Sequence, residues 1–244
     1  MAGGIFITGT DTGVGKTLLT GGLAAVLRDE GIDAGVMKPV ETGCHMEGGR
    51  CLAEDAVFLG NMAQSRDEMD LVNPYALQEP ITPALAAERA GVVIDLSLIK
   101  KAFETLKQRH DIVQVEGAGG LLSPLYGEYL MAELARELEI PILLVSRGSL
   151  GTINHTLLSL YYASRESIPV TGVVVNHTSP SPGPSGALNP GAIRRWGKAP
   201  VLGVIPFLRQ VNPETIKEAV KNNLDLAGIR SMAGEKRQVK PVLP

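Results

Sequence analysis

The chain has 244 residues, of which 44% are apolar and 20% charged, and its formal net charge is -3. These proportions and this length suit one large α/β domain with a substantial core. The small negative charge provides no general attraction for nucleic acid, and four Phe, five Tyr and one Trp are few for stacking bases. We therefore expect no nucleic-acid partner. Glycine is the exception in composition, because the chain has 28, whereas an average protein of this length would carry roughly 17.

The cysteines and the N-terminal segment indicate in which cellular compartment the protein would be found. Cys44 and Cys51 are too few for a disulfide framework and favour a reducing environment. The first residues lack the positively charged start and the long apolar run of a signal peptide. No apolar run reaches the roughly 18 residues that a membrane span requires. We expect a cytoplasmic protein with no membrane partner.

Short β-branched runs alternate with amphipathic stretches, a pattern typical of βαβ units. Most of the runs are continuously apolar, as in strands that helices cover on both faces. The predicted strands span Ile5–Thr8, Ala34–Lys38, Ile112–Glu116, Ile142–Ser146, Val170–Asn176 and Val201–Ile205. We therefore predict a single α/β domain over residues 1–244, built on a doubly wound, mainly parallel sheet.

Apolar residues at helical spacing predict the helices between these strands. In Lys16–Glu30 the apolar residues share one face and Gly31 provides the stop. Asp95–His110 repeats the pattern, with Asp95 as the candidate N-cap. The other predicted helices span Tyr129–Glu139, Thr152–Arg165 and Pro213–Asn223.

Two segments lack a regular pattern. Thr178–Gly191 contains four prolines and three glycines, so it predicts a surface loop. This loop is either a tolerated insertion or a lid over a site. Ala233–Pro244 predicts a polar C-terminal tail.

The segment Gly9–Thr17 reads GTDTGVGKT and stands between a predicted strand and a predicted helix. In the common P-loop pattern, G-x-x-x-x-G-K-[ST], a glycine occupies the position of Thr10. A triphosphate nevertheless needs only consecutive backbone N–H groups at a helix N-terminus, flanked by small residues. Lys16 would add positive charge at the β- and γ-phosphates, and the Thr17 hydroxyl would bind Mg²⁺. The sequence thus predicts a P-loop NTPase architecture.

Charged residues at other strand ends predict the rest of the site. Glu116 closes an apolar strand and precedes small residues, which is the Walker B arrangement of a magnesium ligand. Asp55 is a second candidate ligand, although its surroundings AEDA could equally be the charged first turn of a helix. Lys38 ends the second strand, where it would stabilise charge on a phosphoryl group or an anionic substrate. The alternative for Lys38 is an ordinary surface lysine.

The chain resembles the dethiobiotin synthetase family through several segments in the family's order and spacing. These segments are GTDTGVGKT, MKPVETG, AEDA, VEGAGGLLSPL, LGTINHT and VVVNHT, the last followed by GVIPF. The resemblance runs from Thr8 to about Phe207. It implies an ATP-dependent ligase that needs Mg²⁺, forms a cyclic urea from 7,8-diaminononanoate and CO₂ or bicarbonate, and works as a homodimer. One substrate amine takes up CO₂ as a carbamate, whose oxygen attacks the γ-phosphate of ATP. The second amine then closes the ring on the mixed carbamic–phosphoric anhydride and releases phosphate.

The resemblance also implies roles for residues. Lys38 would be catalytic, with Lys16 and Thr12 beside the carbamate and the transferring phosphate. The metal would be held by Thr17, Asp55 and Glu116. Nucleotide contacts are implied for Gly13, Val14, Gly15, Lys16, Thr17, Leu18, Asp55, Glu116, Gly117, Ala118, Gly119, Asn176, His177, Ile205, Pro206 and Phe207. Substrate contacts are implied for Thr12, Lys38, Thr42, Leu150, Gly151, Thr152, Ile153 and Asn154.

For two groups of these residues the resemblance also implies which part of the ligands they would contact. Asn176 would contact the adenine edge, with His177 beside it, and residues 205–207 would wall the base. Residues 150–154 open a predicted helix, whose N–H groups would hold the far carboxylate of the diamino acid. In the family this carboxylate pocket is completed across the dimer interface. Thr178–Gly191 departs from the family pattern and has no tyrosine to complete the substrate site.

Other interpretations explain fewer of these residues. Partition and septum-site ATPases share this class of P-loop and act as nucleotide-switched binding proteins. They carry an extra lysine at the start of the loop, where this chain has Thr10, and often end in a basic amphipathic element, which this sequence does not show. Cys44, His45 and Cys51 supply three potential zinc ligands in one segment with no fourth in sight, so we interpret them as incidental.

Overall fold

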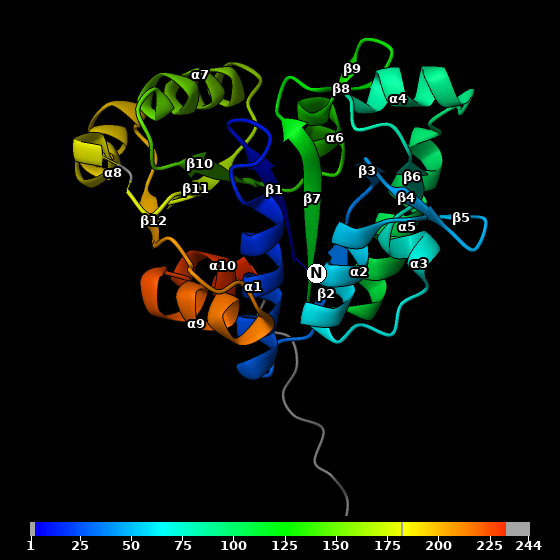
Figure 1. Ribbon diagram of the computed structural model, residues 1–244, viewed down its shortest axis with the longest axis horizontal. Coiled ribbons are helices and arrows are strands. Elements are labelled where there is room, and N and C mark those ends of the chain that lie inside the picture. The colour runs from blue at the N-terminus through cyan, green and yellow to red at the C-terminus, as the bar shows by residue number, and fades with distance from the viewer. Residues whose placement is uncertain (1–2, 182, 233–244) are drawn as a thin grey trace, which may run out of the picture.

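Six parallel strands form the central sheet in the order β12-β11-β10-β1-β7-β2 (Figure 1). They are β1 (Gly3–Gly9), β2 (Ala34–Met37), β7 (Ile112–Gly120), β10 (Ile142–Arg147), β11 (Val170–Asn176) and β12 (Val201–Ile205). The computed structural model describes residues 3–181 and 183–232. From β1 the chain first builds one side of the sheet, with β2 and β7, and then the other, with β10 to β12. The predicted strands and the doubly wound parallel sheet are confirmed.

Helices cover both faces of this sheet (Figure 1). One face carries α1 (Lys16–Asp29), α9 (Pro213–Asn223) and α10 (Ala227–Met232), and the other carries α5 (Leu96–Arg109), α6 (Met131–Glu137), α7 (Thr152–Arg165) and α8 (Gly183–Gly197). Alternate residues of β1 supply the two cores, because successive strand side chains point to opposite faces. Ile5 and Ile7 pack with α1 and α9, whereas Phe6 packs with α5 and α6.

Smaller elements extend the fold beside β2 and β7. They are α2 (Glu54–Ala63), α3 (Met69–Val72), α4 (Pro83–Ala90) and the two-stranded pairs β3 (Val40–Thr42) with β6 (Tyr75–Leu77), β4 (His45–Glu47) with β5 (Arg50–Leu52), and β8 (Pro124–Tyr126) with β9 (Tyr129–Leu130). α2 packs against α1, where Leu59 joins a buried cluster with Ala24 and Val36. The sequence does not predict these pairs, because strands of two or three residues are too short to show an alternation of apolar and polar residues.

The predicted helices form with small changes at their ends. The Asp95 side chain caps α5, where it accepts a hydrogen bond from the backbone N–H of Ser97 at 2.8 Å. The helix predicted from Tyr129 starts at Met131 instead, because the two preceding residues pair in β9. Among the described residues, every helix is too short or too polar to cross a bilayer.

The predicted surface loop Thr178–Gly191 is wrong over its second part, where α8 begins at Gly183. Pro184 lies in the first turn, where a helix needs no backbone N–H donor. Pro190 removes one internal hydrogen bond, yet packing against α7 keeps the helix intact. Asn189 is buried and donates from Nδ2 to the carbonyl oxygen of Gly148 at 2.8 Å. The predicted tail Ala233–Pro244 lies outside the described residues.

Candidate active site

The P-loop joins β1 to α1 at the carboxyl edge of the sheet. Gly15 has a φ of 97°, which is in the left-handed region, and a Cβ there would lie 2.1 Å from Asn176 Nδ2. Only glycine fits this position. Asn176 in turn donates from Nδ2 to the carbonyl oxygen of Val14 at 2.9 Å. The end of β11 thus holds the P-loop in place.

Lys16 begins α1, and its side chain is largely buried beside the P-loop. Its Nζ donates to the backbone carbonyl of Asp11 at 3.3 Å. Burial lowers the pKa of the Lys16 amine; the Glu116 carboxylate opposes this shift and the Lys38 charge adds to it. Two lysines therefore bring positive charge to the same edge of the sheet.

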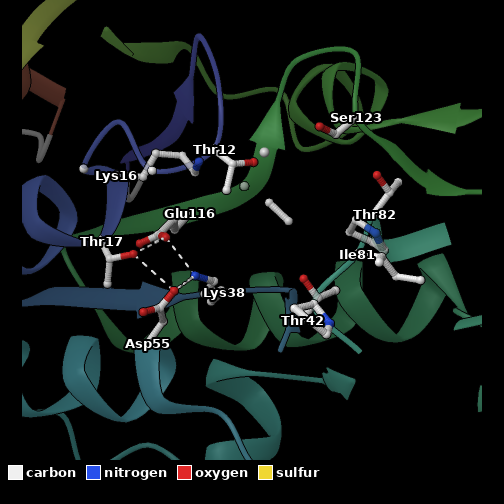
Figure 2. Close-up of a pocket in the computed structure, with 17 residues that line it drawn as sticks. Thr12, Lys16, Thr17, Lys38, Thr42, Asp55, Ile81, Thr82, Glu116 and Ser123 are labelled. Atoms are coloured by element: carbon white, nitrogen blue, oxygen red, sulfur yellow. Dashed lines mark hydrogen bonds and ion pairs between the residues drawn. The ribbon is translucent and has the colours of Figure 1, made fainter. Parts of the chain in front are cut away.

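A cluster of four side chains stands at the centre of the site (Figure 2). Lys38 Nζ lies 2.9 Å from Glu116 Oε1 and also donates to Asp55 Oδ2. Thr17 Oγ1 lies 2.8 Å from Glu116 Oε1 and 3.2 Å from Asp55 Oδ2. Burial would lower the pKa of Lys38, but the carboxylates of Glu116 and Asp55 outweigh it and raise the pKa. Lys38 is therefore an ammonium ion held between two carboxylates.

The same cluster offers oxygen donors of the kind that magnesium takes. A hydroxyl from Thr17 and carboxylates from Asp55 and Glu116 converge there (Figure 2). Glu116 is fully buried, and its Oε2 atom has no hydrogen-bond partner among the described residues. A buried carboxylate oxygen without a donor is costly unless a cation satisfies it. The residues present thus fit a divalent cation.

A cavity of about 470 Å³ opens onto this cluster (Figure 2). Its lining includes the predicted site residues Thr12, Gly13, Gly15, Lys16, Thr17, Lys38, Thr42, Asp55, Glu116, Gly117, Ala118 and Gly119. It also includes residues that the sequence analysis missed, namely Pro80, Ile81, Thr82, Pro83 and Ser123. The sequence feature that could have indicated these residues is Thr82-Pro83, because threonine at the N-cap and proline at N1 are typical of the start of a helix, here α4.

The other predicted site residues lie outside this lining. Val14, in the P-loop, is buried in the core cluster that α1 covers, and Leu18, in α1 itself, is half-buried against that cluster. Asn176 ends β11 and His177 follows it, beside the end of β12, where the backbone N–H of His177 donates to the carbonyl of Ile205 at 2.9 Å. Pro206 and Phe207 follow and are exposed. This group therefore reaches the P-loop through Asn176 rather than through the cavity.

Leu150, Gly151, Thr152, Ile153 and Asn154 also lie apart from the first cavity. They stand at the start of α7, where Leu150 is 87% exposed and Gly151 is the N-cap residue. A second cavity of about 670 Å³ runs beside α7 and is lined by His155, Leu158 and Tyr161. Thr12, Thr82 and Ser123 line both cavities, so the two adjoin.

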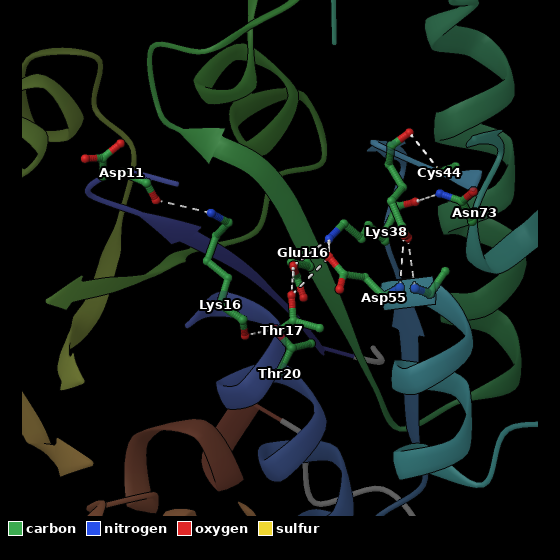
Figure 3. A network of polar contacts seen from close by, with 11 residues as sticks. Asp11, Lys16, Thr17, Thr20, Lys38, Cys44, Asp55, Asn73 and Glu116 are labelled. Atoms are coloured by element: carbon green, nitrogen blue, oxygen red, sulfur yellow. Dashed lines mark hydrogen bonds and ion pairs between the residues drawn. The ribbon is translucent and has the colours of Figure 1, made fainter. Parts of the chain in front are cut away.

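Two buried polar residues that the sequence analysis did not single out support the cluster. Asn73 donates from Nδ2 to the carbonyl oxygen of Lys38 at 2.6 Å (Figure 3). The Glu41 carboxylate accepts hydrogen bonds from the backbone N–H groups of Asp55 at 2.9 Å and Ala56 at 3.0 Å. Burial raises the pKa of Glu41, while these hydrogen bonds oppose the rise. Both contacts join segments that are distant in sequence, which explains why no local pattern indicated them.

Comparisons with known proteins agree with this architecture. A family model described as an AAA domain matches residues 3–215. Similar solved structures include the MinD cell division protein of Aquifex aeolicus, with a TM-score of 0.54 and 18% identity over 89% of this chain and 87% of that one. At this identity the likeness shows the fold alone. It gives the septum-site alternative no support beyond a shared architecture.

Curated relatives are much more similar in sequence, and those compared carry the name ATP-dependent dethiobiotin synthetase. The relative from Thermodesulfovibrio yellowstonii is 37% identical over 95% of this chain and 100% of its own length. The one from Bacillus subtilis strain 168 is 35% identical over 95% and 99%. The one from Methanocaldococcus jannaschii is 44% identical over 70% and 78%. Since these relatives are 35–44% identical over 70–95% of this chain, the chain belongs to the ATP-dependent dethiobiotin synthetase family of ligases.

Proposed function

We propose that this protein closes the cyclic urea of dethiobiotin from 7,8-diaminononanoate and CO₂, with conversion of ATP to ADP and phosphate. The observation that carries the proposal is the cluster of Lys38, Asp55, Glu116 and Thr17 at the floor of a cavity beside the P-loop. A cation, paired carboxylates and a phosphate-binding loop at one place suit phosphoryl transfer to an anionic acceptor.

In this proposal the P-loop amides and Lys16 bind the β- and γ-phosphates. Thr17, Asp55 and Glu116 hold Mg²⁺, which when bound neutralises charge on the phosphates. The unpartnered Glu116 Oε2 supports this assignment. Residues 117–119, which follow Glu116, line the same cavity. The glycines among them have no Cβ, so the backbone there can approach the nucleotide closely.

The nucleophiles in this reaction belong to the substrate, so the protein's task is to position and to stabilise charge. One substrate amine takes up CO₂ as a carbamate, and the carbamate oxygen displaces ADP from the γ-phosphoryl group. The second amine then attacks the mixed anhydride and releases phosphate. Lys38 and Lys16 stabilise the negative oxygens of the carbamate and the phosphoryl group, with Thr12 and Thr42 as hydrogen-bonding neighbours in the cavity. The Lys38 ammonium, which contacts Asp55 and Glu116 at the cavity, would donate to these oxygens.

We also propose an adenine site at the ends of β11 and β12. Asn176 and His177 would contact the base edge, and residues 205–207 would wall it. The contact of Asn176 with Val14 supports this, because it ties this group to the loop that would bind the phosphates. Leu18, in the first turn of α1, lies on the same side of the sheet.

The far carboxylate of the diamino acid would bind at the start of α7, in a homodimer whose partner completes the pocket. Two observations support this. The backbone N–H groups at the start of α7 suit a carboxylate, and exposed apolar side chains lie on the same helix and just before it, including Leu150, Leu158 and Tyr161. The enzyme would work in the cytoplasm, where ATP is available and the two cysteines, which form no disulfide in the structure, would stay reduced.

The test is to incubate the protein with diaminononanoate, bicarbonate and MgATP and to detect the cyclic urea by mass spectrometry. We expect a product that carries one carbon from ¹³C-bicarbonate and one phosphate released per ring closed. The matched control is Lys38→Ala under the same conditions. Phosphate release that does not depend on the diamine would contradict the proposal and favour a nucleotide-switched ATPase.

A further inference from the structure

The start of α2 is capped from another segment of the chain. Ala53 is the N-cap residue, and its side chain has no oxygen to accept the first N–H groups of the helix. Glu41, in β3, supplies both acceptors instead. Its Oε1 accepts from the backbone of Asp55 and its Oε2 from that of Ala56. The buried Glu41 carboxylate thus caps α2 in place of a local N-cap side chain. One of the two N–H groups that it binds belongs to Asp55, the candidate metal ligand.

The sequence around Glu41 explains why this contact has consequences for the site. β3 begins two residues after Lys38 and ends at Thr42, so Glu41 lies between two residues of the cavity. The chain that connects β3 to α2 runs through the β4–β5 hairpin, where residues 45–47 are exposed. Lys38 itself contacts the Asp55 side chain, whereas the Glu41 hydrogen bonds hold the backbone at the start of α2.

The rest of α2 is held independently. Leu59 is buried against α1 and β2, and Met62 packs against Ala25 of α1. Loss of the Glu41 contacts would therefore leave the helix in place but release its first turn. Asp55 lies in that turn, and its Oδ2 must stay near Thr17 and Glu116 to share a ligand with them.

We propose that Glu41 is a positioning residue that orients Asp55 for the metal by capping α2 from β3. This inference rests on the proposed function, in which Asp55 is a magnesium ligand. Residues that orient metal ligands by hydrogen bonds typically contribute about 10- to 100-fold to metal affinity. The chemistry that Glu41 recognises is the pair of backbone N–H groups, so a carboxylate is required and an amide is a poor substitute.

The chain offers a matched control in Glu54. This residue lies in the same first turn of α2 and carries the same charge, but its side chain is 71% exposed and faces His45. Glu54→Gln removes one negative charge from the helix N-terminus without touching the Asp55 backbone. A difference between the Gln variants of Glu41 and Glu54 therefore reports the buried contacts rather than the charge.

The experiment measures Mn²⁺ binding in the presence of ADP by electron paramagnetic resonance, with no turnover. We expect Glu41→Gln to weaken Mn²⁺ affinity about 10- to 100-fold, with metal-free ADP affinity unchanged and Glu54→Gln like the original protein. Equal Mn²⁺ affinity in Glu41→Gln and Glu54→Gln would overturn the proposal. If Glu41→Gln does not fold, Glu41→Asp serves instead. It keeps the charge but shortens the reach by one methylene, so weaker Mn²⁺ binding supports the proposal and unchanged binding overturns it.

Asp55→Asn separates this inference from the proposed function. Weakened Mn²⁺ binding in Asp55→Asn with normal binding in Glu41→Gln would reject only the role of Glu41. Unchanged Mn²⁺ binding in Asp55→Asn would instead remove Asp55 from the metal site, and the proposed function would lose that ligand.

Discussion

Lys38, which directly follows β2, and Glu116 of the neighbouring strand β7 form a buried ion pair, with Nζ and Oε1 2.9 Å apart. The register of the sheet pairs Met37, the last residue of β2, with Val115 of β7, and Lys38 and Glu116 are the next residues of the two segments. Lys38 and Glu116 thus directly follow two residues that the sheet register pairs. The site depends on this register.

Lys38→Ala should lower turnover about 10²- to 10³-fold, as when one donor to a developing oxyanion is removed. ATP binding should be largely retained, because the P-loop contacts remain. The variant also leaves Glu116 charged and buried without its partner, which typically costs about 3–5 kcal/mol of folding stability. Steady-state kinetics and nucleotide titration below the melting temperature check this, with the exposed Lys101→Ala as the control. Unchanged turnover would rule out the assigned role.

Glu116→Gln keeps the shape of the side chain and removes its charge. We expect poor turnover and a shift of the magnesium dependence to higher concentrations, because Glu116 would supply one of two carboxylate ligands. Rates measured over a range of Mg²⁺ at constant ATP give the result. A variant with the magnesium dependence of the original protein would exclude Glu116 from the metal site.

Gly15→Ala should abolish nucleotide binding, because the added Cβ would lie 2.1 Å from Asn176 Nδ2 and displace the P-loop. Gly31→Ala is the matched control, since Gly31 also has a positive φ, of 82°, but its added Cβ meets nothing within 4 Å in the described structure. The control should lose about 1 kcal/mol of stability from backbone strain and bind ATP normally. Calorimetric titration with ATP distinguishes the two, and equal affinities would show that the Asn176 contact does not constrain the loop.

Leu158→Glu should dissociate the proposed homodimer, because Leu158 lies among exposed apolar side chains beside the second cavity. If the partner completes the carboxylate pocket, the KM for the diamino acid should rise while the KM for ATP changes little. Sedimentation velocity and steady-state kinetics measure both effects. A monomer with an unchanged KM for the diamino acid would contradict the shared pocket.

The Asp67 carboxylate should make folding stability depend on pH in the acid range. Burial alone would raise its pKa, but hydrogen bonds from Ser65, Arg109 and His110 lower it. A carboxyl whose folded pKa lies below the ordinary 3.8 adds stability that is present above that value and is lost as pH falls through the folded pKa. Asp67→Asn should therefore cost about 1–3 kcal/mol near pH 7 and less below pH 4. Urea unfolding across this range tests it, with the exposed Asp70→Asn as the control.

The strand ends predicted part of this site from sequence because chain order and sheet polarity constrain them strongly. An apolar run that ends in Glu116, another that ends in Lys38, and a glycine-rich turn after β1 must all reach the carboxyl edge of one parallel sheet. For Asp55 the sequence allows two interpretations, a magnesium ligand and a residue in the first turn of a helix. It lies in the first turn of α2, and its carboxylate also joins the cluster.

The alternation of strands and helices, the parallel sheet and the phosphate loop are predictable from the sequence alone, because each depends on local periodicity or on a contiguous motif. The helix that begins at Gly183 depends on long-range packing instead, since contact with α7 outweighs the low helix propensity of proline and glycine. The same holds for Glu41, whose partners lie 14 and 15 residues further along the chain. A buried carboxylate that caps a distant helix leaves no pattern in the residues around it, because the contact exists only when the chain is folded.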